Sequence, residues 1–192
     1  MVMTMRTEVH EEKFVELLVH AVNELSASEK GMATKLNKIL YFCDFAHVRR
    51  TGDPITGFDY QKLPQGPAPR AMMPIRDRLV AEGTLAVRTT TDAFGYNHHV
   101  FSSPREADLS VFSDAERQTI EEVISEIMHM SARQVSDLSH EDAGWQLVEV
   151  GQPIPYATAY LGNESELPER LRSVVEESAR AVEKKLGSRL AG

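Results

Sequence analysis

Seven histidines are the side chains of this sequence best suited to bind a metal ion or to transfer protons. His98 and His99 are adjacent, and His140 precedes Glu141. Adjacent residues of a strand point to opposite faces, so His98 and His99 are poorly placed to share one ion. No HxxxH or HExxH spacing occurs. We therefore expect no metal and no cofactor, and an enzyme with a site built on His98, His99 or His140 stands as an alternative.

The single cysteine, Cys43, is the candidate thiol nucleophile. Its neighbours Ile39, Leu40, Phe42 and Ala46 are apolar. Apolar surroundings raise the pKa of a thiol and leave it unreactive. One cysteine also excludes an internal disulfide, which favours a reducing compartment.

The motifs of several common enzyme classes are missing from the sequence. There is no GxSxG of a serine hydrolase, no GxxxxGK(S/T) phosphate loop and no GxGxxG dinucleotide fingerprint. The serines lie mostly where helix caps and loops are expected, and there their hydroxyls satisfy backbone groups. We therefore expect a protein that is not an enzyme.

Most of the secondary structure that the sequence predicts is helical. Apolar residues at helical spacing predict a first helix through Phe14 to Leu25 and a second from near Met32 to a stop at 51–54. A third helix is expected from Pro69 or Arg70 to Glu82, and a fourth follows a capping box of Ser113 and Glu116. A short fifth helix is expected around Val135 and Leu138. In the second helix one face carries Leu36, Ile39, Leu40, Cys43 and His47, and we expect Lys35, Lys38, Asp44 and Arg49 to face away from it.

Two strands are predicted over 84–90 and 96–102, joined as a hairpin by a loop of about five residues. Before the third helix, the stretch FDYQKLPQGPAPRAMM at 58–73 puts Phe58 and Tyr60 on one face of an extended segment. We expect these aromatics to pack on the hairpin and complete a small sheet. Gly66 and Pro67 are expected to turn the chain into the third helix.

The fold class expected is mainly α with a small antiparallel β element (α+β). We predict a flexible N-terminus over 1–11, one compact helical domain with a β-hairpin over 12–160, and a peripheral, charged amphipathic C-terminal helix over 161–192. No stretch of 18 apolar residues and no apolar leader occurs, so we expect a cytoplasmic protein without a membrane partner.

The net charge of −8 is unevenly distributed. Residues 31–105 carry ten Lys and Arg against six Asp and Glu, which gives +4, and the two flanks together carry −12. Helices followed by a hairpin in a basic segment are also the element order of a winged helix. A DNA-binding regulator that uses Arg70, Arg76, Arg78 and Arg88 on phosphates is therefore a second alternative.

Three segments resemble one known family. KLNKILYFCDFAHVRRTGDPI at 35–55 is similar to the signature helix of the Panacea domain, also called the SocA-like antitoxin domain. FDYQKLPQGPAPRAMM resembles the family's aromatic segment that ends in Gly-Pro, and LSHEDAGWQLVEVGQPIPY at 138–156 resembles its LSH element with a downstream tryptophan. Leu63 and Pro64 depart from the tryptophan or tyrosine that the family often carries before Gly-Pro, and 161–192 looks like an extension.

The resemblance implies a non-enzymatic antitoxin that binds and neutralises a cognate protein toxin. Some members of the family resemble adaptors that deliver the toxin to an AAA+ protease, so the resemblance also implies such a role. The family-signature residues on this sequence are Lys35, Leu36, Tyr41, Phe42, Tyr60, Gly66, Pro67, His140 and Trp145.

The candidate partner-binding residues are Lys62, Gln65, Arg70 and Arg76, which lie on the rigid corner and at the entrance of the third helix. Proline and glycine reduce the entropy lost when a surface segment is fixed against a partner. Trp145 is expected to fill part of the core with its indole N–H bonded to a backbone acceptor. We expect His140 to orient its loop by hydrogen bonding.

Overall fold

The computed structural model describes residues 8–25, 31–91, 95 and 97–161. The expected flexible segment up to residue 7, and all but the first residue of the expected C-terminal helix, lie outside the described residues. In chain order the elements are α1 Glu11–Glu24, α2 Met32–Thr51, β1 Tyr60–Leu63, β2 Gly66–Pro69, α3 Met72–Ala81, β3 Ala86–Thr91, β4 Asn97–Ser102, the 3₁₀ turn η1 Leu109–Val111, α4 Asp114–Met128, α5 Ala132–His140, α6 Ala143–Leu147, β5 Pro153–Ile154 and the 3₁₀ turn η2 Tyr156–Tyr160. The prediction of a mainly α domain with small antiparallel β elements is confirmed.

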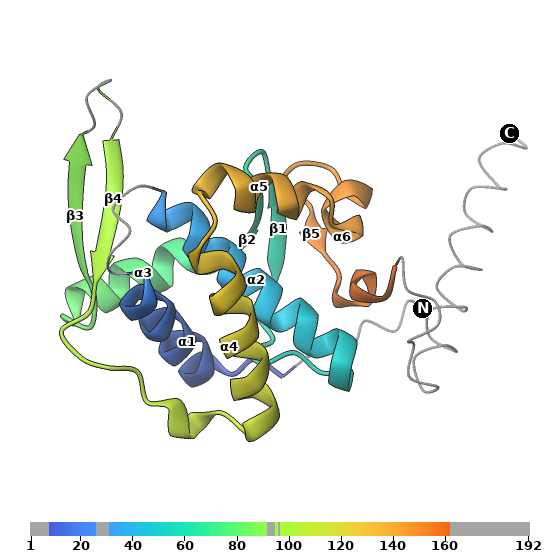
Figure 1. Ribbon diagram of the computed structural model, residues 1–192, viewed down its shortest axis with the longest axis horizontal. Coiled ribbons are helices and arrows are strands. Elements are labelled where there is room, and N and C mark those ends of the chain that lie inside the picture. The colour runs from blue at the N-terminus through green and yellow to red at the C-terminus, as the bar shows by residue number, and fades with distance from the viewer. Residues whose placement is uncertain (1–7, 26–30, 92–94, 96, 162–192) are drawn as a thin grey trace, which may run out of the picture.

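Helix α2 is the centre of the molecule (Figure 1). It contacts α1, α4, α5, β2, β4 and η2, and these neighbours cover it up to its exposed last turn. Its ends are set by Gly31 and Gly52, which both adopt the left-handed conformation that glycine tolerates best. The helix and its partners bury a continuous hydrophobic core that includes Phe14, Leu36 and Ile39.

The expectation that Lys35, Lys38 and Asp44 face away from the core is wrong. Their side chains are 4%, 2% and 0% exposed. Each nevertheless has a hydrogen-bond partner: Lys35 Nζ donates to the Met128 carbonyl, Lys38 Nζ donates to the Pro67 carbonyl, and Asp44 accepts from Thr56. A single apolar stripe predicts an outward polar face only for a helix with a solvent side, and α2 is open to solvent only in its last turn, where Arg49 is exposed as expected.

The corner at 58–73 is a β-hairpin, which corrects two predictions. Strand β1 pairs antiparallel with β2, with Leu63 opposite Gly66, so Pro64 and Gln65 form a two-residue loop. Gly66–Pro69 is thus a strand, and α3 begins only at Met72. The prolines fit because β2 is an edge strand in which they alternate with Gly66 and Ala68, whose N–H groups remain for β1.

The expected single sheet is two separate sheets. One has the strand order β2-β1-β5, and the other consists of β3 and β4 (Figure 1). Phe58 and Tyr60 therefore do not pack on the β3–β4 hairpin to complete its sheet. Phe58 packs on Phe14, with ring centroids 4.3 Å apart, and Tyr60 joins Tyr41 and other rings beside α2.

The predicted capping box of α4 is confirmed. Glu116 N donates to Ser113 Oγ, and Ser113 N donates to the Glu116 carboxylate at 2.8 Å. Helix α5 begins with a second box, made by Ser131 and Gln134. The two boxes fix where α4 and α5 begin.

Candidate partner-binding surface

Segments far apart in the sequence meet beside the β1–β2 hairpin. From α2, Lys38 Nζ donates to the Pro67 carbonyl at 3.1 Å and the Tyr41 hydroxyl donates to Asp142 at 2.6 Å. Asp142 is the N-cap of α6 and accepts from the backbone N–H groups of Gly144 and Trp145. The three segments singled out in the sequence are thus joined by direct hydrogen bonds, one from a side chain to the backbone and one between two side chains.

Gly66 has no room for a side chain. A Cβ at this position would lie 2.2 Å from Ser139 Oγ and 2.6 Å from Lys38 Cε, and the backbone φ is +99°. The hydroxyl of Ser136 adds a bond from α5 to the Gln65 carbonyl at 2.9 Å. The backbone of Gly66 therefore packs directly on α5, and the Gln65 carbonyl is held by Ser136, so the hairpin tip is fixed against α5.

Trp145 links the hairpin to α6. Its indole Nε1 donates to the Leu63 carbonyl at 3.1 Å, which confirms the predicted bond to a backbone acceptor. The Lys62 ammonium lies 4.0 Å from the ring centroid on one side, a cation–π contact. The ring is only partly buried, so one part of it packs on the core and another is accessible.

His140 acts differently from the prediction. Its imidazole stacks on Trp145, with centroids 4.1 Å apart and planes 20° from parallel. Its Nε2 atom is buried and has no hydrogen-bond partner among the described residues. The backbone carbonyl of His140, not the ring, accepts a bond from Gln146. The side chain thus supports Trp145 by ring contact.

Three of the four candidate partner-binding residues border this site. Lys62 is half-buried against Trp145, and Gln65 is exposed in the hairpin loop. Arg70 is exposed and donates to the Gly151 carbonyl at 3.2 Å, while Gly151 N donates to the Lys62 carbonyl at 2.8 Å. These two bonds tie both ends of the hairpin to the segment before β5.

Arg76 lies apart from this group, on α3. It pairs with its neighbour Asp77 at 2.6 Å, and Arg78 pairs with Glu11 and Glu82. Two of the four basic side chains that a winged helix would direct at phosphates, Arg76 and Arg78, are therefore already paired with carboxylates of Asp77, Glu82 and Glu11. This arrangement gives no specific support to DNA binding.

Two exposed apolar side chains follow Trp145 in the chain, before Gly151, which is bonded to Lys62 and Arg70. Leu147, at the end of α6, is 67% exposed and Val150 is 59% exposed. Sequence periodicity missed both because they lie in a turn-rich segment without a regular period. We call the set Lys62, Pro64, Gln65, His140, Trp145, Leu147 and Val150 the hairpin-tip surface. It combines an aromatic ring, a cation and exposed apolar groups on a fixed backbone, and of these side chains tryptophan is the type enriched at protein interfaces.

A second cluster, around Asp44, is enclosed. Asp44 accepts from the N–H and hydroxyl of Thr56, and it also contacts the hydroxyls of Tyr60 and Tyr156. Burial raises the pKa of Asp44, and it raises the pKa of Tyr60 as well. Because the carboxyl group is 0% exposed, this cluster organises the core and offers no access to a substrate.

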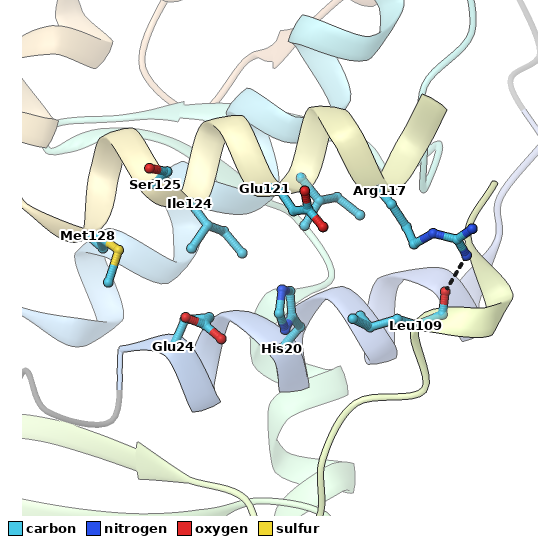
Figure 2. A pocket seen from close by; sticks show the side chains of 9 residues that line it. His20, Glu24, Leu109, Arg117, Glu121, Ile124, Ser125 and Met128 are labelled. Carbon is cyan, nitrogen blue, oxygen red and sulfur yellow. Dashed lines mark hydrogen bonds between the residues drawn. The ribbon is translucent and has the colours of Figure 1, made fainter. Parts of the chain in front are cut away.

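A pocket of about 280 Å³ lies between α1 and α4 (Figure 2). His20 and Glu24 line it from α1, and Glu121 and Ser125 line it from α4. Arg117 stands at one end and is held by the Leu109 and Phe112 carbonyls and by Asp114. The polar groups here belong to two helix faces and form no nucleophile and base pair.

The remaining candidates for chemistry are dispersed. Among the described residues, no three His, Cys, Asp or Glu side chains are placed to hold a metal ion. His99 contacts Thr89 across the β3–β4 hairpin, whereas His140 ends α5, which packs on β2 of the other sheet. Burial raises the pKa of the Cys43 thiol well above its ordinary value, as predicted.

Comparison with protein families gives one match: residues 36–146 match the model described as antitoxin SocA-like, Panacea domain. The match covers more than half of the 192-residue chain. The chain belongs to the SocA-like Panacea domain family. Comparisons with curated proteins and with solved structures find no match.

The matched part of this Panacea domain contains α2 from Leu36 onward, the β1–β2 hairpin and nearly all of α6. Most signature residues serve the framework. Lys35, Leu36, Tyr41, Tyr60, Gly66 and Pro67 are buried, and Phe42 is half-buried against the core. His140 and Trp145 are the two signature residues that reach the hairpin-tip surface. No helix in the described part of the chain is long and apolar enough to cross a membrane.

Proposed function

We propose that this Panacea domain is an antitoxin that binds a cognate protein toxin directly, without catalysis, through the hairpin-tip surface. The observation that carries the proposal is the meeting of the family's sequence segments at one half-exposed tryptophan, Trp145, held between His140 and Lys62. Tryptophan is one of the residue types enriched among those that dominate the binding energy of protein interfaces.

The rigidity of the surface favours binding. The loop at Pro64 and Gln65 is held by bonds from α5 and α6, so little backbone entropy is lost when a partner docks. Leu147 and Val150 supply apolar area that a partner can cover, and Lys62 and Arg70 supply positive charge beside it. A partner surface with an apolar patch next to carboxylates fits this arrangement.

Co-expression with the product of the adjacent open reading frame tests the proposal. We expect that product to stop growth when it is expressed alone. When the two proteins are expressed together, growth should recover and the product should co-purify with this protein. Leu147→Asp should abolish neutralisation because it places a charge in the contact area. Met73→Asp is the matched control, since Met73 is an apolar residue 57% exposed on α3, away from this surface. A harmless neighbour that does not co-purify, or a Leu147→Asp variant that still neutralises, contradicts the proposal.

Delivery of the toxin to an AAA+ protease is a further step of the same proposal. It predicts that the half-life of the toxin in the cell falls when this protein is present and recovers when the protease is deleted. A chase experiment that follows the toxin measures this. An unchanged half-life together with neutralisation leaves direct binding alone as the mechanism.

A further inference from the structure

The outer edge of strand β3 carries no partner strand in the described part of the chain. The other sheet is protected: its edge strand β2 carries two prolines and packs on α2 and α5, and its other edge, β5, has only two residues. The β3–β4 hairpin instead projects beyond the helices, and β3 is exposed along nearly all its length (Figure 1). Open edges of this kind template pairing with another chain unless they are blocked.

The direction of the backbone groups of β3 follows from one contact. Phe101 N donates to Met32 Sδ at 3.2 Å, so this N–H points away from β3. Val87 lies opposite Phe101, so these two residues form a pair without backbone hydrogen bonds. Bonded and non-bonded pairs alternate along an antiparallel ladder, so Thr89 and Thr91 also lie in pairs without backbone hydrogen bonds to β4. The N–H and C=O groups of these three residues face outward.

Side-chain contacts support the same assignment. Thr89 Oγ1 contacts His99 Nδ1 at 3.4 Å, and Thr91 Oγ1 donates to Asn97 Oδ1 at 2.9 Å. Side chains across an antiparallel ladder are closest in the pairs that lack backbone bonds. The outward groups of Val87, Thr89 and Thr91 therefore form a regular unpaired row.

We propose that this row pairs antiparallel with the same row of a second copy of the chain, about a two-fold axis at Thr89. This register sets Thr89 opposite Thr89 and Val87 opposite Thr91, and it uses all three outward residues. It places Arg88 opposite Thr90, whereas a register shifted to an axis at Arg88 would oppose two guanidinium groups. Threonine and valine favour strands, and threonine pairs are favourable across them. The inference is independent of the proposed antitoxin function.

The contact is a short strand edge, so the dimer should be weak and should depend on concentration. Sedimentation equilibrium over a concentration series tests it with the full chain. Thr89→Pro removes an outward N–H without removing a β3–β4 bond, and it should raise the dissociation constant at least about tenfold. Thr89→Val keeps the N–H and should remain dimeric. A wild-type chain that is monomeric throughout, or a Thr89→Pro variant that dimerises normally, overturns the proposal.

Cross-linking tests the register even where the proline variant does not fold. Facing strand residues lie within the Cα separation that a disulfide spans, so Thr89→Cys should form a disulfide-linked dimer on mild oxidation. Thr90→Cys is the matched control and should cross-link far less, because it faces Arg88 of the second copy. The native Cys43 is 0% exposed and does not interfere. Equal cross-linking of the two variants overturns the register. If the wild-type chain is a monomer and Thr89→Pro loses toxin binding, the proposed dimer is wrong and the β3 edge binds a strand of the toxin instead.

Discussion

At the scale of single residues, the buried carboxyl group of Asp44 determines the hydrogen bonding around it. The hydroxyls of Thr56, Tyr60 and Tyr156 all contact its Oδ2 atom, while Tyr60 also donates to the Leu40 carbonyl at 2.8 Å and Tyr156 to the Phe58 carbonyl at 2.7 Å. Each hydroxyl has one proton, so these contacts outnumber the protons available. A protonated Asp44 supplies another proton, and burial favours this form by raising the pKa, against the hydrogen bonds from Thr56, Tyr60 and Tyr156, which favour the ionised form.

A neutral Asp44 predicts different outcomes for two substitutions. Asp44→Asn retains the shape, one acceptor and a donor, and should lower the free energy of unfolding by no more than about 1 kcal/mol. Asp44→Ala leaves the Thr56 N–H and several hydroxyls without an acceptor and should cost about 3 kcal/mol or more. Urea denaturation at pH 7 measures both. If the asparagine variant is as unstable as the alanine variant, the carboxyl group is ionised in the folded protein.

Gly66 predicts a second residue-scale result. Gly66→Ala combines a positive φ with a Cβ placed 2.2 Å from Ser139 Oγ, and should destabilise the fold by about 3 kcal/mol. Gly83→Ala is the matched control, because Gly83 has a φ of +74° and no atom within 4 Å of the added Cβ. It should cost only about 1 kcal/mol. Thermal unfolding measures both variants. A similar loss of stability in the two would mean that the residues around the hairpin tip move to accommodate the added methyl group.

At the scale of elements, the enclosure of α2 makes stability depend on pH. Burial lowers the pKa of Lys38 to about 8, against an ordinary value of 10.5. Between these values the unfolded chain holds a proton that the folded chain has lost, so stability rises with pH and is lost as pH falls through 8. We expect Lys38 to contribute a rise of about 2 kcal/mol in the free energy of unfolding from pH 7 to pH 9.5. The buried Cys43 thiol acts in the opposite sense, because it keeps a proton that the thiol of the unfolded chain loses, so the Lys38 contribution is measured as the difference between the wild-type and Lys38→Met curves. Lys38→Met should flatten this rise. The control Lys62→Met, at a half-exposed lysine, should keep it. A rise of the same size in Lys38→Met would show that Lys38 is not the group that titrates.

The elements also show what the sequence could predict. Periodicity and caps located α1 to α5, because each has an apolar face or a local signal such as Ser113 with Glu116. Helix α6 was missed, because its five residues are too few to show a helical period. The β1–β2 hairpin was missed because prolines weaken a strand pattern, and only the pairing with β1 shows that they occupy permitted edge positions. The burial of Asp44 depends on Tyr156, 112 residues away, and no local pattern records such a contact. Trp145 was found through family resemblance, whereas Leu147 and Val150 required the fold.

At the scale of the whole molecule, the folding unit should be longer than the family match at 36–146. Phe14 and Leu17 of α1 are 0% exposed against the core, and the Tyr160 hydroxyl donates to the Val48 carbonyl at 2.7 Å. We therefore expect residues 8–161 alone to unfold cooperatively near the melting temperature of the full chain, as the proposed domain over 12–160 requires. Residues 36–146 should show no cooperative transition by circular dichroism. A cooperative transition of the short form at the full-chain temperature would contradict this expectation.

The enclosure of α2 also sets an order of events during synthesis. Its covering partners come from both sides of it in the chain, and Tyr156, which closes over Asp44, is made 112 residues later. At ordinary rates of translation that interval lasts about 6 to 22 s. During this time the central helix lacks its last neighbours, and Lys38 and Asp44 remain hydrated until their partners arrive. The domain therefore completes its core, and with it the hairpin-tip surface, only when almost all of residues 8–161 have left the ribosome.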